Sequence, residues 1–357
     1  MRKRKILVTG IGGYWGSRVA QALVQNPVYQ VLGLDTVAPQ QPVPGMDFIQ
    51  ADIRNPLLVE LLKSEKIDTV YHLAFRNTER PSEAAFDYNV MGTMKVFGAC
   101  AAAGVRKIIF KSSTAVYGAA PQNSAFLRED HPLNGSRSHG SIRYLMEVEA
   151  FCNGFRRQSP EVNLTILRFA SVVGPTADAP LVRYLRQPVS AVLMGFDPMM
   201  QIIHEDDVVD ALVHAGEGDY PGIFNVAAED VIPLTKLLGL AGQRRVPVFH
   251  PFAYWGYGLF GSRGLRFTRH LPIELDYIRY RWVGDLQKMR EVLGFAASHT
   301  AEETLRQFAE QRSAKKPVLE ISVPASYDAD HLRETIERRH VSETQAGGGE
   351  SLEATDE

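Results

Sequence analysis

Short apolar runs alternate with longer helical patterns through the first half of this 357-residue chain. Because the runs lack a strict alternation of polar and apolar positions, they are typical of strands buried on both faces. The repetition predicts an α/β fold in which helices cover a doubly wound parallel sheet. The predicted strands are Lys5–Thr9, Gln30–Leu34, Asp47–Ile49, Thr69–Leu73, Lys107–Lys111 and Asn163–Arg168, and the predicted helices are Gly13–Gln25, Pro81–Ala103 and Ser138–Arg157.

The alternation becomes irregular after Pro175. Ile202-Ile203 and Ile223–Val226 still have the pattern of strands, whereas Leu234–Arg290 mixes aromatic residues with Gly and Pro. The pattern therefore predicts a main domain of residues 1–175, to which 200–228 return. A small, discontinuous C-terminal domain is predicted from 176–199 and 229–312. Residues 341–357 are rich in Gly, Glu, Ser and Thr, so this tail is expected to be disordered.

Composition and charge exclude several classes of function. The chain has 39 basic and 41 acidic residues, so it lacks the positive excess of a nucleic-acid-binding protein. No segment approaches the roughly 18 uninterrupted apolar residues of a transmembrane helix, and the basic start Met1–Lys5 runs directly into the first strand. Cys100 and Cys152 have no metal-ligand spacing, so no metal site is expected, and buried thiols suit a cytoplasmic protein.

The strongest local signal is the glycine cluster between the first strand and the first helix. Gly10 permits a tight turn, Gly13 lets the backbone approach a pyrophosphate, and Gly16 lets the helix pack on the sheet. Asp35 ends the second strand nineteen residues after Gly16, where a carboxylate can accept the ribose hydroxyls. It would also repel a 2′-phosphate. The pattern predicts a Rossmann-type site for NAD rather than NADP, with Gly12, Tyr14 and Trp15 completing the loop.

Several further motifs follow in an order that resembles the extended short-chain dehydrogenases, or NAD-dependent epimerase/dehydratases. The resemblance covers about residues 5 to 310. It implies that the main domain binds NAD, that the small domain binds substrate, and that Asp52, Ile53, Leu73, Ala74 and Asn89 contact the cofactor. The motifs are Asp52-Ile53, His72-Leu73-Ala74, Asn89-Val90-Met91-Gly92-Thr93, Ser112-Ser113-Thr114-Ala115-Val116-Tyr117-Gly118, Leu167-Arg168, Gly174-Pro175, His204-Glu205-Asp206-Asp207-Val208, Phe224-Asn225-Val226, Asp285-Leu286-Gln287-Lys288 and Leu293-Gly294-Phe295.

The catalytic half departs from this family's pattern. The family reaction uses a Tyr whose pKa, about 10 when free, is lowered by a Lys one helical turn later. A Ser on the fifth strand binds the reacting oxygen, and Ser113 occupies that position. No Tyr in this chain has a Lys four residues later, so the Tyr-x-x-x-Lys pair is missing.

Three alignments of the helix after Ser138 remain open. Counting back from Leu167-Arg168 without gaps places Ser141 at the Tyr position and Leu145 at the Lys position. A shift of two residues gives His139 and Arg143, a titratable group with a fixed cation one turn away. A shift of three gives Tyr144, a phenol without its usual activator. His139, Arg143 and Tyr144 are therefore catalytic candidates beside Ser113.

The remaining predictions concern substrate and partners. One hypothesis is redox chemistry at a hydroxyl or carbonyl of a small molecule, with a nucleotide sugar as the candidate substrate. The other is a non-catalytic NAD(H)-binding sensor or assembly protein. The resemblance implies a homodimer that pairs through the helices at Pro81–Ala103 and Ser138–Arg157. The aromatic-rich stretch Phe249–Phe267 is expected to pack into the core of the small domain, and the alternatives are a substrate pocket, an oligomer face or a peripheral membrane contact.

Overall fold

Seven parallel strands form the central sheet of the computed structural model, which describes residues 3–249, 273–312 and 337. The strand order is β3-β2-β1-β4-β5-β6-β10, and every neighbouring pair is parallel. The order reverses between β1 and β4, which is where nucleotides bind in doubly wound folds. The strands are β1 (Arg4–Thr9), β2 (Tyr29–Asp35), β3 (Met46–Gln50), β4 (Thr69–His72), β5 (Lys107–Ser113), β6 (Asn163–Phe169) and β10 (Gly222–Val226).

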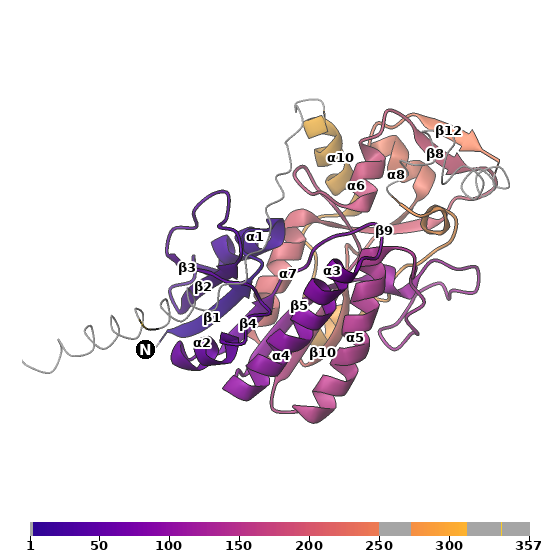
Figure 1. Ribbon diagram of the computed structural model, residues 1–357. Helices are drawn as coiled ribbons and strands as arrows, with labels where there is room; N and C mark the ends of the chain where they lie inside the picture. The colour runs from indigo at the N-terminus through magenta and orange to yellow at the C-terminus, as the bar shows by residue number, and fades with distance from the viewer. Residues whose placement is uncertain (1–2, 250–272, 313–336, 338–357) are drawn as a thin grey trace, which may run out of the picture.

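Helices cover both faces of this sheet (Figure 1). Ile109 of β5 packs in the core on the side of α1 and α7, whereas its neighbours Ile108 and Phe110 pack in the core on the side of α2, α4 and α5. This alternation explains why the strand runs are apolar throughout. The five helices are α1 (Tyr14–Leu23), α2 (Leu58–Ser64), α4 (Gly92–Ala103), α5 (Gly140–Gln158) and α7 (Glu205–Glu217).

The predicted helix Pro81–Ala103 is not continuous. It begins with α3 (Glu83–Phe86), whose first turn is capped by the Ser82 hydroxyl, and passes through a π-helical turn at Asp87–Met91 before α4. A π turn adds a residue to the helical repeat and redirects the side chains in it. The apolar period of the sequence does not reveal this turn, because α3 and α4 both keep helical spacing.

A second group of elements begins where β6 ends. β7 (Ser171–Val173) pairs with β9 (Met199–His204), which in turn pairs with β11 (Val231–Pro233), so the predicted strand Ile202-Ile203 joins this small sheet rather than the central one. β8 (Ser190–Leu193) pairs with β12 (Arg245–Val248). Three helices lie with these strands: α6 (Pro180–Leu185), α8 (Leu234–Leu240) and α10 (Ala301–Arg312) (Figure 1).

Two sequence predictions fall partly or wholly beyond the described ranges. The aromatic stretch Phe249–Phe267 lies outside the described residues except for Phe249, and the tail 341–357 lies outside them entirely. Within residues 3–249 and 273–312, no helix combines the length and the apolar character needed to cross a membrane.

Candidate functional site

The glycine loop between β1 and α1 is built by close backbone contacts. Gly10 has a φ of +75°, and a Cβ on it would lie 2.6 Å from the backbone nitrogen of Ala74. A Cβ on Gly16 would overlap the carbonyl oxygen of Gly10. Both positions therefore exclude any larger residue. This contact also places the Leu73-Ala74 segment, which follows β4, directly against the loop.

The start of α1 fits a phosphate group. Gly13 is the exposed N-cap of this helix, no side chain among the described residues caps its first-turn amides, and its first turn carries no acidic residue. The amides and the positive end of the helix dipole are thus left for an anion from outside the helix. Tyr14 and Trp15 stand in the same turn, with their rings 4.8 Å apart in an edge-to-face arrangement.

Asp35 lies at the rim of the loop. One carboxylate oxygen accepts a hydrogen bond from the Gly12 amide at 3.0 Å, and the other accepts one from the Thr36 amide at 2.7 Å. Burial raises the pKa of this carboxyl, and the backbone donors, Gly12 first, partly offset that effect. The carboxylate is oriented by these bonds and retains acceptor capacity, as a ribose-binding residue requires.

Asp52 and Ile53 lie after β3 and are both buried. Although burial disfavours the charged form of Asp52, hydrogen bonds and charge from Arg54 outweigh it and lower the pKa of the carboxyl. Arg54 binds both oxygens of Asp52 and also pairs with Asp87 in the π turn. Gly92 packs on Ile53, since a Cβ there would lie 2.8 Å from the Ile53 side chain. The predicted contact of Asp52 and Ile53 with the cofactor stays a prediction.

A hydrogen-bonded chain joins β1, β4 and α4 beneath the loop. The Thr9 hydroxyl accepts from the Leu73 and Ala74 amides at 3.3 Å each and lies 2.8 Å from Nδ1 of His72. Nε2 of His72 lies 2.9 Å from the Thr93 hydroxyl, which donates to the Asn89 carbonyl. Thr93 must therefore accept from His72, which assigns the neutral ring its proton on Nε2. Burial lowers the pKa of His72 to about 3.

Asn89 reaches this region because of the π turn. Its side chain accepts from the Arg76 amide at 2.8 Å and donates to the Arg76 carbonyl at 2.9 Å. Asn89 is fully buried, so these two bonds use the side chain to hold the segment after β4. Among the described residues, Asn89 thus fixes the backbone at Arg76, in the segment after β4 that lies beside the predicted cofactor site.

Ser113 ends β5 and caps the short 3₁₀ turn Thr114–Tyr117 by accepting from the Ala115 amide at 3.2 Å. A hydroxyl that only accepts still has its proton to donate. Tyr117 is taken up elsewhere: its hydroxyl donates to Asn225 at 2.7 Å and accepts from Arg168 at 2.7 Å. Burial raises the pKa of Tyr117 to about 12, although Arg168 opposes this.

The orientation of α5 is determined by a buried ion pair. Glu149 binds Arg168 of β6 at 2.5 Å and accepts from the Ser112 hydroxyl at 2.5 Å, and both charged residues are almost fully buried. Leu145 stands one turn and Ser141 two turns before Glu149, and both are buried on the same face of α5. Tyr144 and Val148 are buried on α5 as well, so this orientation does not distinguish the gapless alignment from the shift of three residues. The hydroxyl of Ser141 accepts from the Thr78 amide at 2.7 Å and donates to the Thr78 carbonyl.

The three catalytic candidates at α5, Tyr144, Arg143 and His139, differ in burial and in hydrogen bonding. Tyr144 is buried, and its hydroxyl accepts from the Ser82 amide at 2.6 Å and donates to the Ser82 carbonyl at 2.8 Å. Arg143 is exposed. His139 precedes the helix with its Nδ1 buried and without a partner among the described residues, and burial lowers the pKa of its ring. In the described part of the chain, none of the three hydrogen-bonds to Ser113.

Lys111 is a site residue that sequence reasoning missed. It lies on β5 two residues before Ser113, partly buried, with its ammonium 5.0 Å from the ring centre of Trp15 and 5.7 Å from that of Phe169. Burial lowers the pKa of this lysine to about 8. The available signal was a single Lys between the apolar run Ile108–Phe110 and the Ser112-Ser113 pair.

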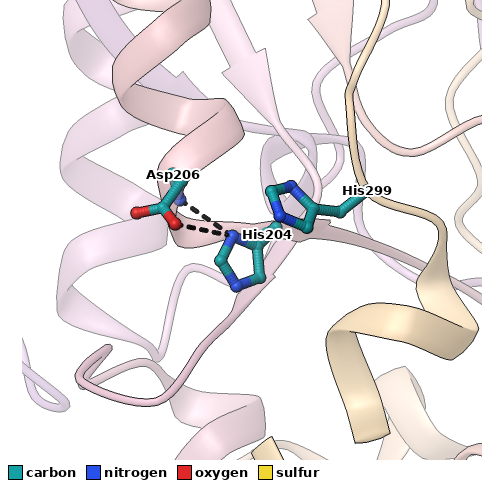
Figure 2. Close-up of side chains that lie close together, drawn as sticks. All are labelled: His204, Asp206 and His299. Carbon is teal, nitrogen blue, oxygen red and sulfur yellow. Dashed lines mark hydrogen bonds and ion pairs between the residues drawn. The ribbon is translucent and has the colours of Figure 1, made fainter. Parts of the chain in front are cut away.

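A second polar cluster lies at the start of α7. Figure 2 shows His204 at the end of β9, Asp206 in the first turn of α7, and His299 from the segment before α10. Their potential ligand atoms lie within 4.8 Å of one another. However, Nδ1 of His204 accepts from the Asp206 amide at 3.2 Å, and the two imidazole rings stack with centroids 4.0 Å apart. These contacts make the cluster a helix cap joined to the α10 segment.

The first turn of α7 also contacts the glycine loop. Glu205 accepts from the Tyr14 hydroxyl at 2.7 Å, and Arg18 donates to the same hydroxyl at 2.7 Å. Burial raises the pKa of Tyr14. Glu205 also binds the backbone and side chain of Thr176, which follows β7. The predicted loop residue Tyr14 thus connects the glycine loop to both β7 and α7.

Comparison with known proteins decides the family. Residues 6–227 match the NAD dependent epimerase/dehydratase family. The chain belongs to this family. The family resemblance inferred from the motifs is therefore confirmed, and so are the Rossmann-type fold, the enzyme class and NAD as the cofactor. Nothing in the comparison tests the missing Tyr-x-x-x-Lys pair.

Relatives cover most of the chain. An uncharacterized protein of Mycobacterium tuberculosis (strain ATCC 25618 / H37Rv) is 32% identical over 312 residues, which are 84% of this chain and 81% of the relative. The UDP-glucose 4-epimerase of Mycolicibacterium smegmatis is 28% identical over 274 residues, which are 69% of this chain and 86% of that enzyme.

Solved structures of epimerases share the fold. A variant of the UDP-glucuronic acid 4-epimerase from Bacillus cereus, solved with NAD and a UDP-sugar, has a TM-score of 0.67 and 22% identity, covering 87% of this chain and 99% of that one. The UDP-glucose 4-epimerase of Thermotoga maritima, solved with UDP-glucose, has a TM-score of 0.65 and 23% identity, covering 86% and 98%.

Proposed function

We propose that this protein is an NAD-dependent enzyme that oxidises and re-reduces a hydroxyl-bearing carbon of a nucleotide sugar, as an epimerase or dehydratase does. The observation that carries the proposal is the complete nucleotide loop, with Gly10 and Gly16 in contacts that no other residue permits, joined to Asp35 at the end of β2. The family membership and the relatives named as UDP-glucose 4-epimerases support the substrate class.

In this proposal, some residues of the site bind the cofactor and others move a proton of the substrate. The uncapped amides at the start of α1 bind the pyrophosphate, and Asp35 accepts the ribose hydroxyls. NAD held by these residues would supply reversible hydride transfer at the substrate carbon. Ser113 donates a hydrogen bond to the reacting oxygen, while the hydroxyl proton passes to a base. His139, whose imidazole is neutral at physiological pH, is the candidate for that base.

A second function is favoured by one specific observation. The phenol of Tyr144 has both its donor and its acceptor position occupied by the Ser82 backbone, and Arg143 is exposed. A chain that keeps the nucleotide loop but has no free phenol on α5 fits an NAD(H)-binding sensor or assembly protein. Membership in an enzyme family and the unshared proton of Ser113 support the enzyme instead.

The test is a binding and turnover assay on the purified full chain. NADH and NADPH binding is measured by nicotinamide fluorescence, and UDP- and dTDP-sugars are then incubated with NAD and analysed for epimer or dehydrated product. The wild type is compared with Ser113→Ala and with Ser124→Ala, a matched control in which the replaced hydroxyl is exposed. We expect tight NADH binding in all three proteins, preference for NADH over NADPH, and turnover lost only in Ser113→Ala.

Two outcomes of this assay would contradict the proposed enzyme. Tight NADH binding without product from any sugar nucleotide would favour the sensor. Failure of the wild type to bind either nucleotide would contradict both functions, because both depend on the loop.

We also propose how the chain is divided between cofactor binding and substrate binding. Residues 1–175 with 200–228 would form the NAD-binding half, and 176–199 with 229–312 the substrate half. The protein would work in the cytoplasm as a homodimer, and the aromatic stretch after Phe249 would contact substrate, a partner copy or a membrane surface.

A further inference from the structure

Lys111 is an ammonium without an oxygen partner at the nucleotide loop. Its Nζ contacts only the faces of Trp15 and Phe169, and within the described residues it makes no hydrogen bond or ion pair. Burying a lysine is costly unless its charge is paired or the group is neutralised. The two aromatic rings recover part of that cost through cation–π attraction.

The position of Lys111 on β5 relates it to the reacting end of the site. Alternate residues of a strand share a face, so Lys111 and Ser113 both leave β5 on the side of α1. Ser112, between them, points to the opposite face and bonds Glu149 of α5. Trp15 belongs to the glycine loop itself. The partly buried lysine is therefore bordered by the loop, by the end of β6 and by the strand that carries Ser113.

We propose that Lys111 is a cofactor-tuning residue, which supplies a positive charge to the reacting end of the dinucleotide site and makes that site favour reduced over oxidised cofactor. The oxidised nicotinamide ring carries a positive charge and the reduced ring is neutral. A like charge nearby therefore weakens binding of the oxidised form only, and so makes the bound cofactor a stronger oxidant. The inference rests on the proposed function, because it requires that the loop bind NAD.

Other charges around Lys111 do not neutralise it, since burial is the cause of its lowered pKa and no neighbouring charge contributes. His72 of β4 is neutral, and Arg168 of β6 pairs with Glu149 on the far face of the sheet. The other charged or titratable groups that the described elements carry on or against this face are Lys107 on β5, Tyr71 on β4, Tyr14 and Arg18 on α1, and Glu205, Asp206, Asp207, Asp210, His214 and Glu217 on α7.

The test measures binding of NAD⁺ and NADH separately, by calorimetry, with no turnover required. The proteins are the wild type, Lys111→Met and the control Lys63→Met, in which an exposed lysine of α2 is replaced. Near pH 6.5 we expect the ratio of the NAD⁺ to the NADH dissociation constant to be about tenfold higher in the wild type than in Lys111→Met, because a neighbouring like charge commonly shifts such an equilibrium by about one decade. Lys63→Met should match the wild type.

A pH series on the wild type gives the same information without a substitution. Above the pKa of Lys111 the charge is gone, so the ratio should fall towards that of Lys111→Met as the pH rises to about 9.5. A wild-type ratio that is independent of pH, or equal ratios in wild type and a folded Lys111→Met, would overturn the inference. If the wild type binds neither nucleotide, it is the proposed function that fails.

Discussion

At the scale of single residues, the polar side chains beneath the nucleotide loop form specific hydrogen bonds with one another. His72 is the central member of one such chain, between the hydroxyls of Thr9 and Thr93. Because both ring nitrogens are bonded and burial holds the pKa near 3, the ring stays neutral in the folded state. An unfolded chain would protonate the same ring below its ordinary pKa of about 6.5. This difference couples folding to pH.

The first prediction is therefore an acid destabilisation that depends on His72. Between the unfolded pKa of about 6.5 and the folded pKa of about 3, the unfolded state binds one more proton. This contribution to stability is complete above about pH 6.5, and it falls by about 1.4 kcal/mol per pH unit below that value. Urea unfolding at pH 7.5, 6 and 5 measures the slope. In His72→Gln the slope should be smaller by about one proton, and an unchanged slope would contradict the neutral ring.

At the scale of elements, the site depends on two close approaches: α1 against β1, and α5 against β6. The first is a backbone contact at a glycine, and the second is a buried ion pair. They differ in how they respond to substitution, because a backbone cannot move aside as a side chain can.

The second prediction concerns the approach of α1 to β1. A Cβ on Gly16 would overlap the Gly10 carbonyl, so Gly16→Ala should displace α1, destabilise the protein and abolish NADH binding. Gly239→Ala in α8 is the matched control, since a Cβ there meets nothing within 4 Å. The control should be as stable as the wild type or about 0.5–1 kcal/mol more stable. Thermal unfolding and NADH fluorescence measure both effects, and normal NADH binding by Gly16→Ala would disprove the contact.

The third prediction concerns the pair Glu149–Arg168. Both side chains are at most 3% exposed, so removing one leaves an uncompensated buried charge. Arg168→Met should lower the free energy of unfolding by about 3–5 kcal/mol, whereas the double substitution with Glu149→Leu should recover part of that loss. Urea unfolding of the two single variants and the double variant tests this. If the double variant is less stable than both single variants, the two charges do not compensate each other in the folded protein, and the prediction is wrong.

At the scale of the whole molecule, the outer face formed by α4 and α5 is the surface proposed for the homodimer (Figure 1). Lys95 and Ala102 of α4 and Ala150 of α5 are exposed on it. Small exposed residues allow two copies of a helix pair to approach closely, and a two-fold arrangement would bury the same patch on both copies.

The fourth prediction is a dimer that a single charge on this face can dissociate. Light scattering on the wild type should give about twice the mass of the chain, and Ala150→Arg should give a monomer, because two arginines would face each other across the two-fold axis. Gln21→Arg, an exposed position of α1 on the opposite side of the sheet, should remain dimeric. A wild type that is monomeric over the whole concentration range would remove the proposal.

The sequence by itself determined the features that depend on contiguous residues. The inner strands of the central sheet appear as apolar runs because they are buried on both faces, whereas the edge strand β3 is only partly buried. The nucleotide loop is readable because Gly10 requires a positive φ and Gly16 has no room for a side chain. Asp35 is readable because its place at the end of β2 follows from the spacing of one βαβ unit.

Only the tertiary structure decided which side chains meet. Thr9 and His72 are 63 residues apart, and Glu149 contacts a strand 19 residues later, so no local period reports either contact. The π turn before α4, which brings Asn89 to Arg76, and the inward face of α5, which leaves Arg143 exposed, are consequences of packing. Lys111 looked like one polar residue in an apolar strand. Trp15 and Phe169, which surround its ammonium group, come from two other segments of the chain, and burial among such segments lowers the pKa of this lysine.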